Sequence, residues 1–197
     1  MKAAASAAAA LLFAACSLSR AQPFEAGFHV GASRINGADI GTLEQGSPDR
    51  IRLSNSFRFG GRMTLNQWLF FGHEVGYAYN RTSWRLGADG ASAGSAIHQG
   101  FYNFLAYATP EGSRIRPFVA GGPHFSNFIY PGFSVSQGGG SNKIGVNYGG
   151  GVKMRVSSKY LIRFDVRQYL QGKPFDFPAQ SGRLTLVEVS AGFSIHL

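Results

Sequence analysis

The fold is decided by the stretch Lys159–Gln171, which reads KYLIRFDVRQYLQ. Apolar side chains at every second position, from Tyr160 to Val166, alternate with Arg163, Asp165 and Arg167. Side chains that alternate with period two lie on opposite faces of a strand. The stretch is about twice as long as the ~5–6 residues of an average strand in a soluble protein. It therefore predicts one long strand with an apolar face and a charged face.

The segment before this strand continues the same pattern. Apolar and polar residues alternate from Lys143 to Val156, and only Ser157 and Ser158 separate the two segments. So short a connection is typical of an antiparallel hairpin.

Similar strands follow one another along the rest of the chain. Six further segments alternate in this way, at residues 24–34, 52–65, 68–83, 96–108, 115–126 and 184–197. The connections alternate between short and long, and the long ones cover residues 35–50, 85–95, 127–142 and 172–183. An even number of long strands with short turns at one end and long loops at the other is typical of outer-membrane barrels. We expect an all-β fold, an eight-stranded antiparallel up-and-down transmembrane β-barrel.

For one hairpin of this barrel, the sequence does not show which side faces the lumen. Both sides of segments 96–108 and 115–126 carry aromatic residues, so the pattern does not say which side faces inward. A soluble lipocalin-like barrel is the rival fold, and it would turn the apolar face inward around a ligand.

The N-terminus has the pattern of a cleavable signal peptide. Lys2 precedes an alanine-rich apolar run, and small residues at Ser19 and Ala21 allow cleavage after Ala21. This predicts a signal peptide at residues 1–21 and a barrel domain at residues 22–197. The single cysteine, Cys16, lies before the cut, so the barrel must fold without disulfides.

The charged residues point to a barrel interior. Only 15% of residues are charged, against about 25% in an average soluble domain. The net charge is +9, but the arginines are dispersed along the sequence and form no patch that would bind nucleic acid. The narrow lumen of an eight-stranded barrel is filled by side chains. We predict a lumen charge network of Arg52, Arg58, Arg62, Glu74, Lys153, Arg155, Arg163, Asp165, Arg167 and Glu188. Paired charges would plug the lumen; the alternative is a narrow, anion-preferring, porin-like channel.

Two segments resemble a known family. The run Tyr148–Lys153, which reads YGGGVK, and the run Arg163–Arg167 resemble the closing hairpins of OmpA-like and OmpX-like small outer-membrane barrels. The last eight residues are similar to the terminal signal that marks such barrels for insertion, with Leu197 in place of an aromatic residue. The resemblance implies an integral protein of the cell outer membrane with both termini periplasmic. It implies a monomer without cofactor, in contact with outer-membrane lipid, lipopolysaccharide and, through the C-terminal strand, the insertion machinery.

One pair of residues suggests catalysis. His124 and Ser126 share a face of a strand, and the run His124–Asn127 is similar to the His-x-Ser-Asn motif of lipid A deacylases, which would make the protein a hydrolase. That family orients its histidine with an acid on the neighbouring strand, but residues 128–160 contain no Asp or Glu. The other histidines, His29, His73, His98 and His196, show no metal-ligand spacing. We expect a structural or surface-interaction role without enzymatic activity, with the channel and the hydrolase as alternatives.

Overall fold

The computed structural model describes residues 24–87, 91–134 and 140–197. The predicted signal peptide at residues 1–21 and its cleavage site lie outside these residues. No helix in the described ranges is long and apolar enough to cross a membrane. The strands are β1 (Phe24–Asn36), β2 (Asp39–Thr42), β3 (Arg50–Leu53), β4 (Ser56–Trp68), β5 (Phe71–Leu86), β6 (Ala91–Tyr107), β7 (Ile115–Ile129), β8 (Gly140–Arg155), β9 (Tyr160–Gly172) and β10 (Arg183–His196).

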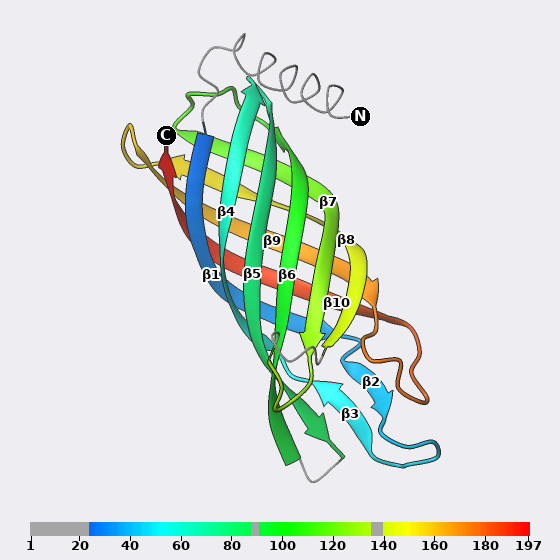
Figure 1. Ribbon diagram of the computed structural model, residues 1–197. Helices are drawn as coiled ribbons and strands as arrows, with labels where there is room; N and C mark the ends of the chain where they lie inside the picture. The colour runs from blue at the N-terminus through cyan, green and yellow to red at the C-terminus, as the bar shows by residue number, and fades with distance from the viewer. Residues whose placement is uncertain (1–23, 88–90, 135–139) are drawn as a thin grey trace, which may run out of the picture.

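Eight of these strands close into a barrel (Figure 1). Each long strand pairs with its neighbour in the chain, and every pairing is antiparallel. The barrel closes where β1 pairs with β10, from Glu25 opposite His196 to Asn36 opposite Thr185. The predicted eight-stranded up-and-down barrel is confirmed, and closure satisfies the backbone hydrogen bonds of both edge strands.

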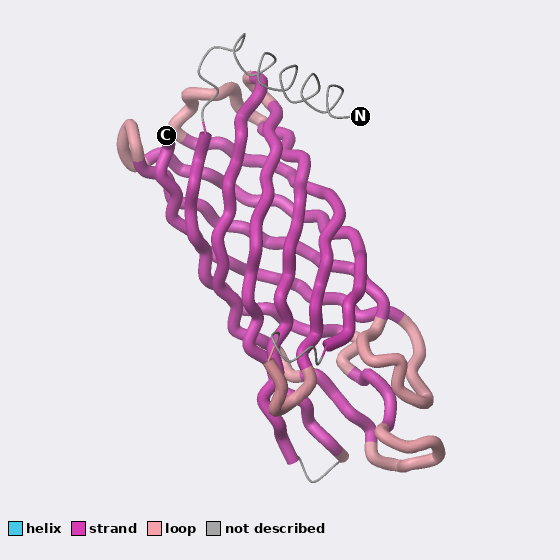
Figure 2. Tube along the Cα trace, in the orientation of Figure 1, coloured by secondary structure: helices cyan, strands magenta, loops and turns pink. Residues whose placement is uncertain are grey.

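The two ends of the barrel differ (Figure 2). Short turns lie at one end, beside the start of β1 and the end of β10. The longer connections lie at the other end, here called the long-loop end. There β2 and β3 form a small hairpin inside the first connection, and β3 adds to the edge of β5 through Ile51 opposite Leu86 and Leu53 opposite Trp84.

Two sequence predictions need correction at the long-loop end. The predicted strand at residues 52–65 is two strands, because the alternation shifts at Ser54 and Asn55 between β3 and β4. Asn55 accepts a hydrogen bond from the Ile35 amide there, and the Ser54 amide donates to Ser83. The predicted loop at residues 85–95 is mostly strand, since β5 and β6 run beyond the barrel as an extended hairpin and pair up to Leu86 and Ala91.

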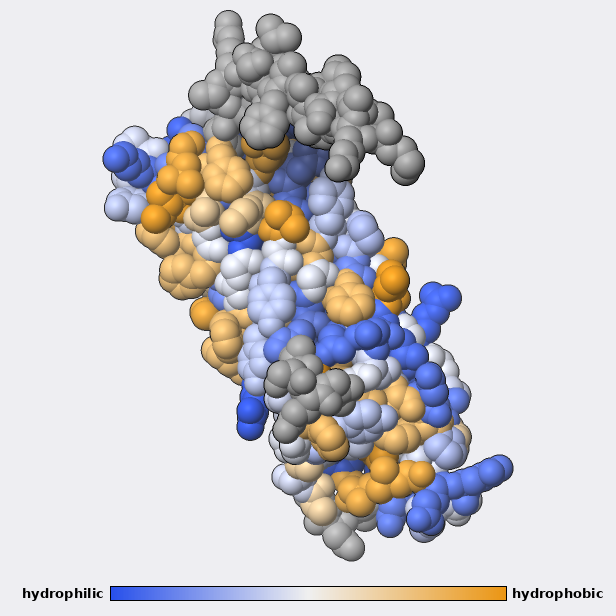
Figure 3. Space-filling model, in the orientation of Figure 1, coloured by the Kyte–Doolittle hydropathy of each residue, from blue (hydrophilic) through white to orange (hydrophobic). Residues whose placement is uncertain are grey.

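The barrel has an apolar outside and a polar inside. Phe28, Val119 and Ile144 are 58%, 64% and 78% exposed on the outer surface. On the face shown in Figure 3, hydrophobic residues cover much of the barrel wall, and hydrophilic residues gather toward the end that carries β2 and β3. This facing excludes the lipocalin-like alternative.

The structure settles the facing of β6 and β7. The side chains that point inward are Ile97, Gln99, Phe101, Asn103, Leu105 and Tyr107 from β6 and Arg116, Phe118, Ala120, His124, Ser126 and Phe128 from β7. Large rings therefore enter the lumen from this hairpin. Gly76 on β5 makes room for one of them, because a Cβ at Gly76 would lie 2.4 Å from the ring of Phe101.

Candidate functional site

The middle of the barrel interior holds a network of five charged side chains. Glu74 on β5 lies 2.5 Å from Arg163 and 2.7 Å from Arg167, both on β9. Asp165, between these arginines on the same face of β9, lies 2.8 Å from Arg163, 3.0 Å from Arg167 and 2.9 Å from Arg62 on β4. All five side chains are almost completely buried. Ionised groups in such a place are stable only when they are paired and hydrogen-bonded, and here the two acids contact three arginines.

Further ion pairs lie above and below this network. Toward the long-loop end, Arg58 lies 3.1 Å from Glu188 and donates a hydrogen bond of 2.9 Å to the hydroxyl of Tyr169. Toward the short-turn end, Lys153 lies 2.6 Å from Glu25 and donates to Tyr107 at 2.8 Å. Each acidic side chain buried in the described barrel therefore contacts at least one basic side chain.

The structure brings most of the predicted lumen residues together. Eight of them are buried inside the barrel: Arg58, Arg62, Glu74, Lys153, Arg163, Asp165, Arg167 and Glu188. Arg155 lies at the short-turn end, half-buried, 3.5 Å from Glu111. Arg52 does not belong to the network. It lies exposed on the outer face of β3, because the shift at Ser54 and Asn55 turns its neighbours Ile51 and Leu53 inward instead.

Sequence reasoning missed part of this interior. Arg116 on β7 is buried, pairs with Glu111 and lies 3.7 Å from the ring centre of Tyr107. The Arg163 guanidinium lies 4.2 Å from the ring centre of Phe118. Guanidinium groups are attracted to the faces of aromatic rings, so these rings are part of the charge network. Arg116, Phe118 and His124 fall on the same alternate positions of β7, which is the signal that could have identified them.

The suspected catalytic pair is not assembled as a hydrolase site. His124 and Ser126 are 3% and 0% exposed and point into the barrel. The His124 ring forms a 3.0 Å hydrogen bond with the side-chain oxygen of Gln171, and Ser126 accepts a hydrogen bond from Gln99. Among the described residues, neither forms a hydrogen bond or an ion pair with an acid or with the other. An acyl chain of a membrane lipid would lie on the opposite side of the barrel wall.

No metal site is evident in residues 24–87, 91–134 and 140–197. No three His, Cys, Asp or Glu side chains there are grouped so that they could bind a metal ion.

An apolar cluster closes the interior at the long-loop end. Its centre is Phe175, from the connection between β9 and β10, with ring centres 4.3 Å from Tyr130 and 5.0 Å from Trp84. The other buried members are Ile35, Ile40, Ile51, Leu53, Ile97, Phe128, Tyr169, Leu184 and Leu186. We call this set the apolar cap.

The connection that carries Phe175 is bent back over the cap. Phe175, Asp176 and Ala179 have positive φ angles of 71°, 47° and 54°. Such angles are unfavourable for residues other than glycine and persist only where the surroundings hold them. Gln180 holds the bend by donating hydrogen bonds to the carbonyl oxygens of Pro174 at 2.7 Å and Ile40 at 3.0 Å.

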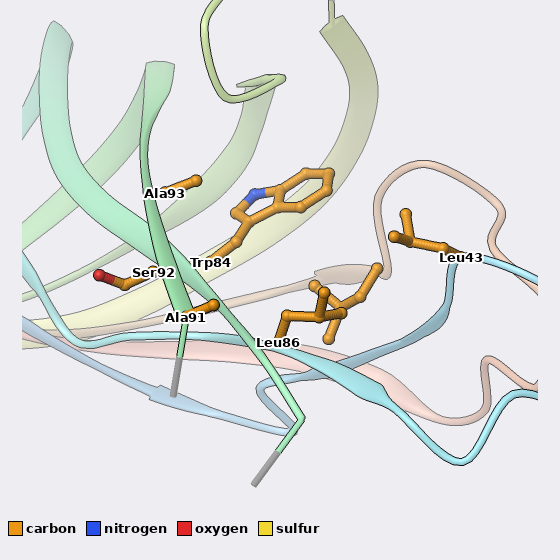
Figure 4. A pocket seen from close by; sticks show the side chains of 7 residues that line it. Leu43, Trp84, Leu86, Ala91, Ser92 and Ala93 are labelled. Atoms are coloured by element: carbon orange, nitrogen blue, oxygen red, sulfur yellow. The ribbon is translucent and has the colours of Figure 1, made fainter. Parts of the chain in front are cut away.

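A small apolar pocket lies beside the cap, inside the extended hairpin of β5 and β6 (Figure 4). Its volume is about 230 Å³, and it is lined by Leu43, Ile51, Trp84, Leu86, Ala91, Ser92 and Ala93. The indole Nε1 of Trp84 is buried and has no hydrogen-bond partner in the part of the chain that the structure describes. A buried donor without a partner is costly, so this nitrogen adds nothing polar to the nearly apolar wall of the pocket.

A family model described as outer membrane protein beta-barrel domain matches residues 5–194 of the chain. The chain belongs to this family. As a member of the outer-membrane β-barrel family it is an integral outer-membrane protein, which agrees with the apolar outer surface. No curated protein matches the chain in a sequence search.

Several solved outer-membrane barrels are similar in structure. The outer membrane protein OprG from Pseudomonas aeruginosa superposes with a TM-score of 0.62 at 13% identity, over 91% of this chain and 97% of that one. Neisserial surface protein A gives 0.61 at 13% identity, over 88% and 97%. The outer membrane protein AlkL, solved in DMPC lipid bilayers, gives 0.60 at 12% identity, over 91% and 92%. At such identities the likeness shows the small-barrel fold alone.

Proposed function

We propose that this member of the outer-membrane β-barrel family is a closed, non-enzymatic barrel that acts at the cell surface through its long-loop end. Both termini would then lie in the periplasm. The short turns and the long connections at opposite ends support this orientation, because such barrels have brief periplasmic turns and longer external loops.

The observation that carries the proposal is the ion-pair network across the barrel interior. A channel that attracts anions needs free cations beside water, whereas Arg62, Arg163 and Arg167 are buried and paired with Glu74 and Asp165. Eight strands leave little space beyond what these side chains fill. The apolar cap adds a second barrier at the long-loop end. The arrangement supports a structural or surface-interaction role over the anion-preferring channel.

Recordings in planar lipid bilayers test this proposal. We expect the purified full chain to insert, as judged by a folded band that shifts on heating, without producing a steady conductance. Arg163→Ala serves as the companion variant, since it removes one member of the network. A steady anion-selective conductance of the wild type that falls in Arg163→Ala would refute the closed barrel and establish the channel.

The absence of catalysis is tested separately. Because His124 and Ser126 are buried and pair with no acid among the described residues, we expect no acyl-chain release from lipopolysaccharide by the wild type or by Ser126→Ala. Release by the wild type that is lost in Ser126→Ala would establish a hydrolase.

A second candidate function is the binding of a small apolar molecule at the long-loop end. The pocket of about 230 Å³ supports it, because an apolar protein cavity of about 150 Å³ is already large enough for benzene. Its lining is apolar except for Ser92, which favours a ligand with an apolar body, such as the chain of a medium-chain alcohol.

Tryptophan fluorescence tests this second candidate. The chain has two tryptophans, Trp68 and Trp84, so Trp68→Phe leaves Trp84 as the single reporter. We expect decanol added to nanodiscs to change the Trp84 emission in a saturable way. Ala93→Phe in the same background fills the pocket and should abolish the change. An equal change in both variants would mean that decanol acts through the lipid and would exclude the pocket.

A further inference from the structure

Where β3 pairs with β5 at the long-loop end, the outer face of the sheet carries two arginines directly opposite each other. Arg52 on β3 pairs in register with Arg85 on β5, and both side chains are exposed. Their neighbours Ile51, Leu53 and Trp84 point the other way, into the apolar cap. Like charges directly opposite in a sheet destabilise the pairing. The position of these two guanidinium groups is therefore unfavourable unless an anion lies between or beside them.

A third arginine extends the same face. Arg81 lies on the outer side of β5, two alternate positions before Arg85. A Cβ built at Gly94 would lie 3.1 Å from Arg81 Nη2, so the guanidinium lies across this glycine on β6 toward the tip of the hairpin. Gly94 thus leaves the space that the arginine needs.

Small residues with hydroxyl groups form the floor between the arginines. Ser83 is the outward residue between Arg81 and Arg85, and Ser92 pairs in register with Arg85. Ser92 borders the pocket, but in Figure 4 its side chain points away from Leu43 and Leu86, toward the other face of the hairpin. Three guanidinium groups around two hydroxyls are a donor set that suits a phosphate group.

These arginines have no protein anion to pair with in the described part of the chain. Arg52, Arg81 and Arg85 form no ion pair or hydrogen bond there through their side chains, whereas the nearby Arg50 pairs with Asp39 at 2.7 Å. Asp49 lies beside Gly87 at the tip of the hairpin and also forms no ion pair among the described residues. Among the described residues, the cluster therefore has no acidic side chain in contact with its three guanidinium groups.

The cluster begins where the apolar belt of the barrel ends. Arg81 lies opposite Phe57 on β4, and the next outward pair toward the barrel is Tyr79 with Phe59. Aromatic residues form belts at the level of the lipid headgroups in such barrels. The arginines beyond the belt are therefore at the height of lipid phosphates.

We propose that Arg52, Arg81 and Arg85 form a binding site for the phosphate groups of lipopolysaccharide in the outer leaflet. This inference rests on the proposed orientation, with the long loops outside. Guanidinium groups bind phosphate through two parallel hydrogen bonds, and a phosphate between Arg52 and Arg85 turns their repulsion into attraction. The site recognises the headgroup from the membrane side, apart from the apolar pocket on the opposite face of the hairpin.

A binding measurement with diphosphoryl lipid A in mixed micelles tests the site. The full chain is compared with Arg52→Gln/Arg85→Gln and with the matched control Arg114→Gln/Lys159→Gln, which removes the same charge from exposed positions at the short-turn end. We expect the first variant to bind about tenfold more weakly and the control to bind within about twofold of the wild type. Equal affinity of the two variants would refute the site.

Two further ligands separate the sources of phosphate. Lipid A with its phosphates removed should bind all three proteins equally weakly, and inorganic phosphate should compete with diphosphoryl lipid A only at high concentration. If phosphatidylglycerol binds as tightly as diphosphoryl lipid A and with the same dependence on Arg52 and Arg85, the proposed specificity for lipopolysaccharide is wrong.

The orientation is tested by a different readout. Gln45 is exposed in the first long connection, and Gln45→Cys should react in intact cells with a maleimide that does not cross membranes. No labelling together with lipid A binding by the purified protein would refute the orientation and the role at the cell surface. Labelling without arginine-dependent binding would refute the phosphate site and leave the proposed function standing.

Discussion

The middle of the barrel and its long-loop end place charged and apolar side chains in opposite ways. In the middle, the buried side chains are charged, and the apolar residues face outward. In the apolar cap, Ile40, Leu184 and Leu186 are completely buried, and Arg50 and Asp39 lie nearer the outside, as in a soluble protein. The arrangement reverses because the barrel wall faces lipid, whereas the long-loop end faces water. The two regions should therefore respond differently to the loss of a charge and to the loss of apolar volume.

Removal of the central acid should have the largest effect. In Glu74→Ala the buried guanidinium groups of Arg163 and Arg167 each lose a partner at 2.5 and 2.7 Å. Loss of one member of a buried ion pair costs about 3–5 kcal/mol. We expect a decrease of that size in the free energy of unfolding, measured by urea titration of the heat-modifiable folded band. Lys143→Ala, which removes the partly exposed partner of the exposed Asp176, is the control and should cost clearly less.

The second prediction replaces one buried ion pair with apolar side chains like those of the apolar cap. Arg58 and Glu188 form the ion pair next to Tyr169, which is itself a member of the cap. Glu188→Leu alone should cost about 3 kcal/mol, because it leaves the Arg58 charge buried without a carboxylate. Arg58→Met/Glu188→Leu should recover most of that loss, since replacement of both members by apolar residues is often neutral.

The same urea titration gives the coupling between the two positions. If the double variant loses as much free energy of unfolding as the two single variants together, Arg58 and Glu188 are not coupled. Apolar side chains would then be unable to replace this ion pair, and the loss of an ionic partner would not explain the effect of Glu188→Leu.

How much of this was predictable differs between the regions. The alternation in Lys159–Gln171 predicts both the strand and the inward facing of Arg163, Asp165 and Arg167, because a strand in a barrel has one wet or charged side and one lipid side. The prediction that Arg52 faces the lumen is wrong, because Ser54 and Asn55 shift the alternation by one residue. Nothing in the local composition marks such a shift. The apolar cap depends on contacts between distant segments, so periodicity within one strand does not reveal it.

The third prediction tests the cap from its centre. Phe175→Ala removes the ring that contacts Trp84 and Tyr130. Burial of a phenylalanine side chain contributes about 1.5–3 kcal/mol, and its loss removes packing that, together with the Gln180 hydrogen bonds, holds the positive φ angles of this connection. We expect faster proteolysis within residues 173–182 while the urea midpoint of the barrel changes little. Phe133→Ala, which removes an exposed ring, is the control, and equal proteolysis of both variants would contradict a cap centred on Phe175.

The smallest effect is expected at the partly exposed ion pair between Asp39 and Arg50. Burial opposes ionisation of Asp39, but hydrogen bonds from Arg50 at 2.7 Å and from the Gly41 amide at 3.0 Å outweigh it, so the pKa of this carboxyl lies below its ordinary value of 3.8. A lowered pKa in the folded state means that the pair stabilises β2 at pH values above 3.8 and that this contribution is lost as the pH falls through the lowered pKa. We expect Asp39→Asn to speed proteolysis of the first connection by no more than about fivefold at neutral pH, because exposed ion pairs are weak. The wild type and Asp39→Asn should converge as the carboxyl is protonated, in assays with an acid-active protease. If the two proteins still differ in proteolysis rate at a pH well below the ordinary pKa of Asp39, the effect comes from the Gly41 hydrogen bond or from packing and not from charge. In that case β2, like the apolar cap, is stabilised mainly by contacts that do not depend on ionisation.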